Sequence, residues 1–201
     1  MTTIGVLALQ GDFAEHAAVL TRSGVDVRGV RLPKDLAGIS GLILPGGEST
    51  TFANLLEAYG LRDPIRSLAQ GGMAIWGTCA GLIALANRVR GRAEAIIGGL
   101  DVEVERNAYG RQVDSFETDI HVPALGEGTY HAVFIRAPVI IKVGPGVKSL
   151  AALGDGPAIA VRQGNLLGTS FHPELTEDAR FHQYFVQLAE ESSRRARASI
   201  R

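Results

Sequence analysis

The sequence has a single cysteine, Cys79, among its 201 residues. One cysteine cannot form an intrachain disulfide, and the paired C-x-x-C motifs of structural zinc sites are absent. A chain of this length buries enough surface to fold without either kind of cross-link. Cys79 is therefore either a small core residue or a nucleophile.

Charge of one sign and long apolar runs are also lacking. The 20 Lys and Arg balance 21 Asp and Glu, for a net charge of −1, which argues against a general nucleic-acid binder. No stretch approaches the roughly 18 apolar residues of a membrane-spanning helix, and the first ten residues lack the basic region of a signal peptide. We therefore expect a cytoplasmic protein that binds neither nucleic acid nor membrane.

Several ligand motifs are missing. The sequence has no Gly-Lys dipeptide, which excludes a P-loop, and no G-x-G-x-x-G or H-E-x-x-H motif. It predicts neither a cofactor nor a metal ion.

The order of apolar segments predicts an α/β fold. Short apolar strands are expected at 3–9, 25–30, 41–44 and 73–76, separated by helical segments that include 51–59, 63–70 and 82–88. This alternation is typical of a parallel sheet covered on both faces. The second half is mostly β-like, at 101–105, 112–122, 130–143, 149–153 and 158–171, and a helix is expected at 177–191.

The sequence contains no repeat and no interdomain linker, so we expect one domain over residues 1–191. The remaining ten residues carry four arginines. They are expected to form a basic, disordered, solvated tail over 192–201.

Cys79 lies in the pattern G-x-C-x-G, directly after an expected strand and before an expected helix. This is the thiol counterpart of the nucleophile elbow, a tight turn that requires small neighbours and exposes the central side chain. Gly77, Ala80 and Gly81 fit that requirement. The backbone N–H of Ala80 can then face a developing oxyanion.

A thiolate nucleophile needs a base within hydrogen-bond reach. His172 is the strongest candidate, because it follows an apolar strand and precedes Pro173 and Glu174, whose carboxylate can orient the ring. Cys79, His172 and Glu174 would form a triad. The other histidines are His16, His121, His131 and His182.

A third segment, Pro45-Gly46-Gly47-Glu48-Ser49-Thr50, ends a strand and opens a helix. Its glycines allow backbone N–H groups to approach a ligand.

Together these segments resemble the class I (triad) glutamine amidotransferases, and most closely the branch that serves pyridoxal 5′-phosphate synthase. The matching segments lie in the expected order at 5–11, 15–16, 44–51, 77–83, 104–112, 134–138 and 169–175. The resemblance implies a three-layer α/β sandwich with a mostly parallel, flavodoxin-like sheet.

The resemblance also implies an activity and a partner. The chain would hydrolyse L-glutamine to glutamate and ammonia, and the ammonia would pass to a separate TIM-barrel synthase subunit within a large hetero-oligomer. Glutamine would be bound by residues of three loops, and two N–H groups would form the oxyanion hole. The pocket residues are Gly47, Glu48, Ser49, Arg106, Ile135 and Arg136, and the oxyanion donors are Gly47 and Ala80.

Three alternatives remain open at this point. The chain could be the glutaminase of another biosynthetic complex, a non-catalytic regulatory subunit of the same fold, or a thiol hydrolase or redox chaperone of related architecture.

Overall fold

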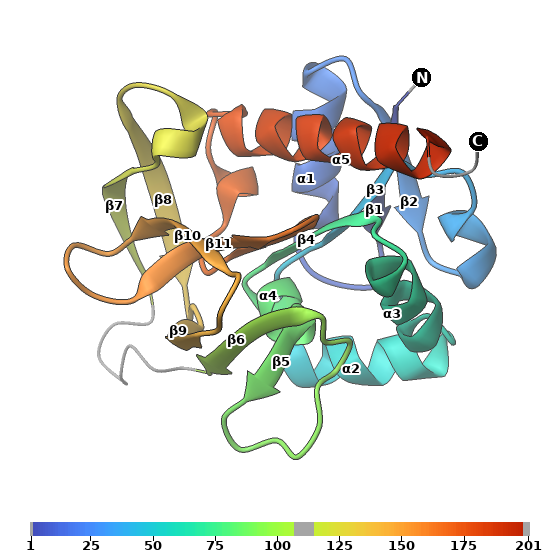
Figure 1. Cartoon of the computed structure of the whole chain (residues 1–201), viewed down its shortest axis with the longest axis horizontal. Helices are drawn as coiled ribbons and strands as arrows, with labels where there is room; N and C mark the ends of the chain where they lie inside the picture. The colour runs from blue at the N-terminus through green and yellow to red at the C-terminus, as the bar shows by residue number, and fades with distance from the viewer. Residues whose placement is uncertain (1, 107–114, 199–201) are drawn as a thin grey trace.

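The computed structural model describes residues 2–106 and 115–198, and a seven-stranded sheet forms its centre (Figure 1). The strand order is β10-β11-β12-β4-β3-β1-β2. From β12 to β2 neighbouring strands pair in parallel, and β10 and β11 add an antiparallel edge. The strand bounds are β1 Thr3–Leu7, β2 Asp26–Val30, β3 Gly41–Leu44, β4 Ala74–Thr78, β10 Lys148–Ala152, β11 Ala158–Gln163 and β12 Leu166–Thr169.

Helices cover the two faces of this sheet (Figure 1). One face carries α1 (Phe13–Arg22) and α5 (Arg180–Ala198). The other carries α2 (Ser49–Ala58), α3 (Arg62–Gln70) and the short α4 (Ala80–Leu85). The expected three-layer α/β arrangement with a mostly parallel sheet is confirmed.

Alternation along the strands creates two separate cores. On β3, Leu42 and Leu44 pack in the cluster under α2, whereas Ile43 packs in the cluster under α5. Successive side chains of a strand point to opposite faces, so a strand covered on both faces is apolar at every position. This explains why the β3 sequence is a continuous apolar run.

Smaller sheets flank the centre. β5 (Ala86–Val89), β6 (Leu100–Glu105) and β9 (Val139–Val143) form a three-stranded sheet, and β7 (Ser115–His121) pairs with β8 (Thr129–Ile135). Three short 3₁₀ helices complete the described elements, at Pro33–Leu36, Pro123–Leu125 and Pro173–Leu175.

One expected segment is wrong in detail, and another is resolved into its parts. The helix expected at 82–88 ends at Leu85, and the chain continues as β5, because the N–H groups of Ile97 and Gly98 reach Ala84 O and end the helix there. The β-like segment expected at 130–143 consists of two strands, β8 and β9. The division falls at Arg136, whose φ of 42° is incompatible with an extended strand.

The last helix is longer than expected. It runs to Ala198 and so includes most of the segment expected as a solvated tail. Ser192 anchors this extension, since it is buried and its hydroxyl donates to Gly72 O at 2.6 Å. A single domain over residues 1–191 stays a prediction.

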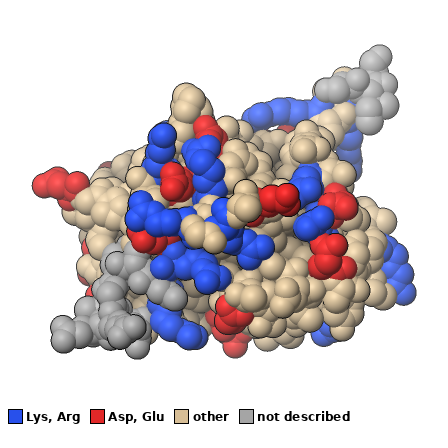
Figure 2. All heavy atoms as spheres, turned by 90° about the horizontal axis from the view of Figure 1, so that it is seen from below, with Lys and Arg blue, Asp and Glu red and all other residues tan. Residues whose placement is uncertain are grey.

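The surface seen from below in Figure 1 carries charges of both signs (Figure 2). On β5 and β6, Arg88 pairs with Asp101 at 3.1 Å, and Arg90 pairs with Glu105 at 2.8 Å. Among the described residues, none of the helices combines the length and the apolar character needed to cross a membrane.

Phe185 tests the core beneath α5. It is fully buried and lies 5.6 Å from the Trp76 ring, centroid to centroid. We expect Phe185→Ala to lower the free energy of unfolding by about 3–5 kcal/mol, because it removes buried apolar surface and leaves a cavity. Urea denaturation measures this. Tyr59→Ala, at a largely exposed aromatic residue, is the control and should change stability by no more than about 0.5 kcal/mol. Equal effects of the two variants would contradict the core assignment.

Candidate active site

Cys79 occupies the sharp turn between β4 and α4. Its backbone φ is 48° and its ψ is −103°, a conformation that costs energy for a residue with a side chain. Backbone hydrogen bonds hold it there: Cys79 N–H donates to Thr169 O at 2.9 Å, and Ile83 N–H donates to Cys79 O at 3.2 Å. The strain and its support fit the nucleophile elbow expected from the sequence.

The two glycines of the elbow are required by close backbone contacts. A Cβ on Gly77 would lie 2.3 Å from Gly81 O, and a Cβ on Gly81 would lie 1.9 Å from Leu44 O. Neither glycine has a positive φ. The turn therefore packs directly against β3, and that contact positions Cys79 at the carboxyl edge of the sheet.

His172 follows β12 and precedes the 3₁₀ turn at Pro173–Leu175. Its backbone N–H donates to Val133 O at 2.8 Å, which ties this turn to β8. The ring Nδ1 lies 2.7 Å from Glu174 Oε1 and 3.2 Å from Asp12 Oδ2. The ring is almost completely buried, as is Glu174.

The electrostatics favour a protonated His172. Burial by itself lowers the pKa of the imidazole, but hydrogen bonds with Asp12, Cys79 and Glu174 outweigh it, and the pKa rises well above its usual value. The Asp12 carboxyl has a lowered pKa because of its hydrogen bond to His172. Burial raises the pKa of Glu174, against the opposing effect of His172.

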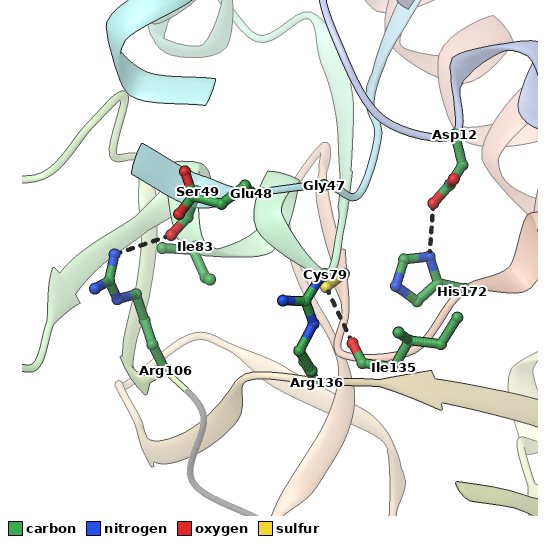
Figure 3. A pocket seen from close by; sticks show the side chains of 10 residues that line it. All are labelled: Asp12, Gly47, Glu48, Ser49, Cys79, Ile83, Arg106, Ile135, Arg136 and His172. Atoms are coloured by element: carbon green, nitrogen blue, oxygen red, sulfur yellow. Dashed lines mark hydrogen bonds and ion pairs between the residues drawn. The ribbon is translucent and has the colours of Figure 1, made fainter. Parts of the chain in front are cut away.

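Figure 3 shows Cys79 and the His172 ring side by side at one end of a pocket, with Asp12 on the far side of the ring. Cys79 Sγ lies 3.9 Å from Ile135 O. The structure thus brings Cys79 and His172 together, with Glu174 behind the ring.

The pocket has a volume of about 330 Å³. All six residues expected to bind glutamine line it, together with Cys79 and His172, and it also contains Asp12 and Ile83. Of the other expected site residues, Ala80 begins α4 directly after Cys79, and Glu174 is sealed from solvent behind His172.

The Gly46–Gly47 segment is held by Gln10. The Gln10 side-chain amide donates to Gly46 O at 3.1 Å, and its oxygen accepts from Glu48 N–H at 3.2 Å. Gly47 has a φ of 133°, and a Cβ there would lie 1.9 Å from Gln10 Oε1. Only glycine fits this position.

Glu48 and Ser49 have further roles beside their place in the pocket wall. The Glu48 carboxylate accepts from Thr50 N–H and Thr51 N–H, at 2.9 and 2.7 Å, and so caps α2. Ser49 Oγ accepts a hydrogen bond from Arg106 at 3.0 Å. The rest of the matching segment that begins at Val104, residues 107–112, lies outside the described residues.

Sequence reasoning missed Asp12 and Ile83. Ile83 sits one turn beyond Cys79 on α4, a position that the elbow pattern itself could have indicated. Asp12 follows the Gln10-Gly11 turn, and only the spatial approach of that turn to His172 reveals it.

Asp12, His172 and Glu174 have potential ligand atoms within 4.8 Å of one another. His172 Nδ1 faces both carboxylates, and hydrogen bonding accounts for these two contacts.

Comparison with known proteins places this geometry in a family. The model of the SNO glutamine amidotransferase family matches residues 6–191. The chain belongs to this family. The membership expected from the elbow, the glycine loop and the His-Pro-Glu turn is confirmed.

Named relatives of this SNO glutamine amidotransferase are similar over nearly their whole length. The "Pyridoxal 5′-phosphate synthase subunit PdxT" of Clavibacter michiganensis subsp. michiganensis is 55% identical over 95% of this chain and 92% of its own. That of Herpetosiphon aurantiacus is 56% identical over 92% of this chain and 100% of its own.

Solved structures agree. One described as a glutamine amidotransferase matches with a TM-score of 0.88 and 52% identity, over 93% of this chain and 98% of its own. The structure of PurLQS from Thermotoga maritima matches with a TM-score of 0.65 over 95% of this chain and 96% of its own, at 18% identity, and shares the fold.

The Glu48 cap predicts a pH-dependent contribution to stability. Hydrogen bonds from the Thr50 and Thr51 backbone N–H groups lower the pKa of Glu48 from 4.5 to about 2. The carboxylate therefore stabilises the fold above pH 4.5, and this contribution disappears as the pH falls through about 2. At pH 7 we expect Glu48→Gln to lower the free energy of unfolding by about 0.5–1 kcal/mol.

Urea denaturation at several pH values measures the difference between native chain and variant, which should shrink between pH 4.5 and 2. Glu57→Gln, near the other end of α2, is the control and should change stability by less than about 0.5 kcal/mol. A difference that stays constant down to pH 2 would contradict the assigned cap.

Proposed function

We propose that this chain hydrolyses the side-chain amide of L-glutamine and delivers the ammonia to a synthase that makes pyridoxal 5′-phosphate. The observation that carries the proposal is that Cys79 and His172 line one pocket, with Glu174 against the His172 ring, and that the pocket wall carries two arginines and a glycine loop. Membership of the SNO glutamine amidotransferase family and the names of the relatives support the choice of substrate and pathway.

In the first half-reaction the Cys79 thiolate attacks the carboxamide carbon of glutamine. The Sγ–C bond forms as the carbonyl π electrons move onto oxygen. His172 then gives its proton to the departing nitrogen, the C–N bond breaks, and ammonia leaves behind a thioester. The raised pKa of His172 suits that role.

In the second half-reaction neutral His172 takes a proton from water, which attacks the thioester carbonyl. The C–S bond breaks, glutamate leaves, and Cys79 and His172 return to their starting state. Glu174 holds Nδ1 of the ring at 2.7 Å throughout. This contact keeps the other ring nitrogen available for proton transfer.

Two backbone N–H groups are proposed to stabilise the oxyanion. Ala80 N–H follows the nucleophile directly, and Gly47 N–H belongs to the loop that Gln10 holds. One such donor contributes roughly 10²–10³ to a rate.

The glutamine pocket is proposed to use charge for the amino-acid end of the substrate. Arg106 and Arg136 line the pocket, and a guanidinium binds a carboxylate through paired N–H donors. Glu48, Ser49 and the Ile135 backbone would complete the contacts.

The partner is proposed to be a separate TIM-barrel synthase subunit that carries several copies of this chain in a large hetero-oligomer in the cytoplasm. Free ammonia must not escape to water, so we expect the pocket to open toward that subunit. The names of the relatives favour this pathway over a glutaminase of another biosynthetic complex.

Removal of the thiol tests the chemistry. In the complex with the synthase, Cys79→Ala should reduce glutamine hydrolysis by at least about a thousandfold, because the covalent step is lost. Glutamate release measures the rate, and a circular dichroism spectrum checks the fold. A folded Cys79→Ala variant that retains native turnover would exclude this chain as the glutaminase.

Partner activation is a separate prediction. The isolated chain should turn over glutamine more slowly than the same chain with the synthase subunit, since we expect the partner to set the final conformation of the Gly46–Gly47 loop that carries an oxyanion donor. The same glutamate assay, with and without a stoichiometric synthase, measures the ratio. Full turnover by the isolated chain would contradict activation, and copurification with a different synthase would favour the alternative pathway.

A further inference from the structure

A row of buried polar groups continues beyond the triad. Glu174 Oε1 faces His172, whereas Oε2 points away from the active site and lies 3.2 Å from Nε2 of His16 on α1. His16 Nδ1 lies 3.0 Å from Nε2 of His182 on α5. Both histidines are fully buried. The helices α1 and α5, on one face of the sheet, therefore contribute polar groups that the proposed reaction leaves unexplained.

The apolar surroundings keep both rings neutral. Burial lowers the pKa of His16 well below its usual value and the pKa of His182 to about 3. Trp76 packs edge-on against both, with ring centroids 5.6 Å from His16 and 5.0 Å from His182. A neutral imidazole carries one N–H donor and one acceptor nitrogen. In the hydrogen bond between the two rings, either His182 donates to His16 or His16 donates to His182.

The far end of the row fixes the direction. His182 Nδ1 is buried and has no hydrogen-bond partner among the described residues. An orphaned N–H donor is rarer in buried surroundings than an orphaned acceptor, so Nδ1 is the bare nitrogen and Nε2 carries the proton. His182 Nε2–H then donates to His16 Nδ1, which leaves the His16 proton on Nε2.

The near end agrees with this assignment. His16 Nε2 lies between Thr78 Oγ1, at 3.3 Å, and Glu174 Oε2. Glu174 Oε2 forms no hydrogen bond of good geometry within the described chain, the 3.2 Å contact with His16 Nε2 included. A carboxylate oxygen buried without a donor is strongly destabilised, so a small shift that turns His16 Nε2–H toward Oε2 would be favourable. The opposite arrangement would face a lone pair of His16 toward that oxygen.

We propose that His182 and His16 form a buried donor chain whose last N–H, on His16 Nε2, holds Glu174 Oε2 and so positions the carboxylate that orients His172. The two histidines are positioning residues, because they act on the substrate only through Glu174 and His172. This inference rests on the proposed glutaminase function for its kinetic consequence.

Two amides of different length test it. The Gln amide nitrogen reaches the position of His Nε2, whereas the shorter Asn side chain reaches only the position of Nδ1. In the complex with the synthase, His16→Asn should lower kcat about 10- to 100-fold, the range typical for loss of an outer partner of an active-site group. KM should change less than about twofold, because neither histidine touches the pocket. His16→Gln should recover kcat to within about fivefold of the native value.

The pair should also be non-additive. His182→Phe removes the donor to His16, and the double variant His16→Asn, His182→Phe should be no slower than His16→Asn alone, since His182 acts through His16. The control is His131→Gln, an exposed histidine that contacts Glu117 and Asp119 on the β7–β8 hairpin. It should leave kcat and KM unchanged.

The outcomes separate the two proposals. If the native complex releases no glutamate, the proposed function fails. If the native complex is active and the folded His16→Asn variant has the same kcat, the donor chain is wrong. It is also wrong if His16→Gln and His16→Asn lower kcat equally. A direct readout independent of activity is the ¹⁵N imidazole NMR spectrum of the native chain. Protons on Nε2 of both His16 and His182 support the donor chain, and a proton on His16 Nδ1 overturns it even where the variants fail to fold.

Discussion

The contact between the elbow and β3 is the constraint on which the site depends. Gly81 lies directly against the carbonyl of Leu44, and Gly77 lies against Gly81. Because no side chain can enter this contact, the end of β4, the start of α4 and the end of β3 are fixed relative to one another. Cys79 and the glycine loop that follows Leu44 therefore reach the same pocket. His172 arrives at that edge because β12 pairs in parallel with β4.

Much of this arrangement could be predicted from the sequence because it is local. The elbow, the glycine loop and the His-Pro-Glu turn each follow an apolar strand, and parallel strands bring their carboxyl ends to one edge. Once the fold class is known, these segments are neighbours. Gly47, Arg106, Ile135 and Arg136 follow from the family resemblance, and the structure places all of them around one pocket.

The parts that could not be predicted depend on contacts between distant segments. Asp12 reaches His172 only because the turn after β1 folds over the edge of the sheet. Ser192 is polar and lies in an arginine-rich stretch, so its sequence context indicates solvent, yet its hydroxyl is buried against Gly72. His16 and His182 likewise are buried polar residues on amphipathic helices. Their contact depends on how α1 and α5 pack together on the sheet, which no local pattern encodes.

The position of Trp76 has a practical consequence. It is the single tryptophan of the chain, it is fully buried on β4, and the rings of His16 and His182 both meet it edge-on. Its indole N–H donates to Thr169 Oγ1 on β12 at 3.2 Å. The tryptophan fluorescence of the native chain thus originates from one site, two residues before the elbow threonine Thr78. Emission spectra consequently report on the interior behind the triad without any added label.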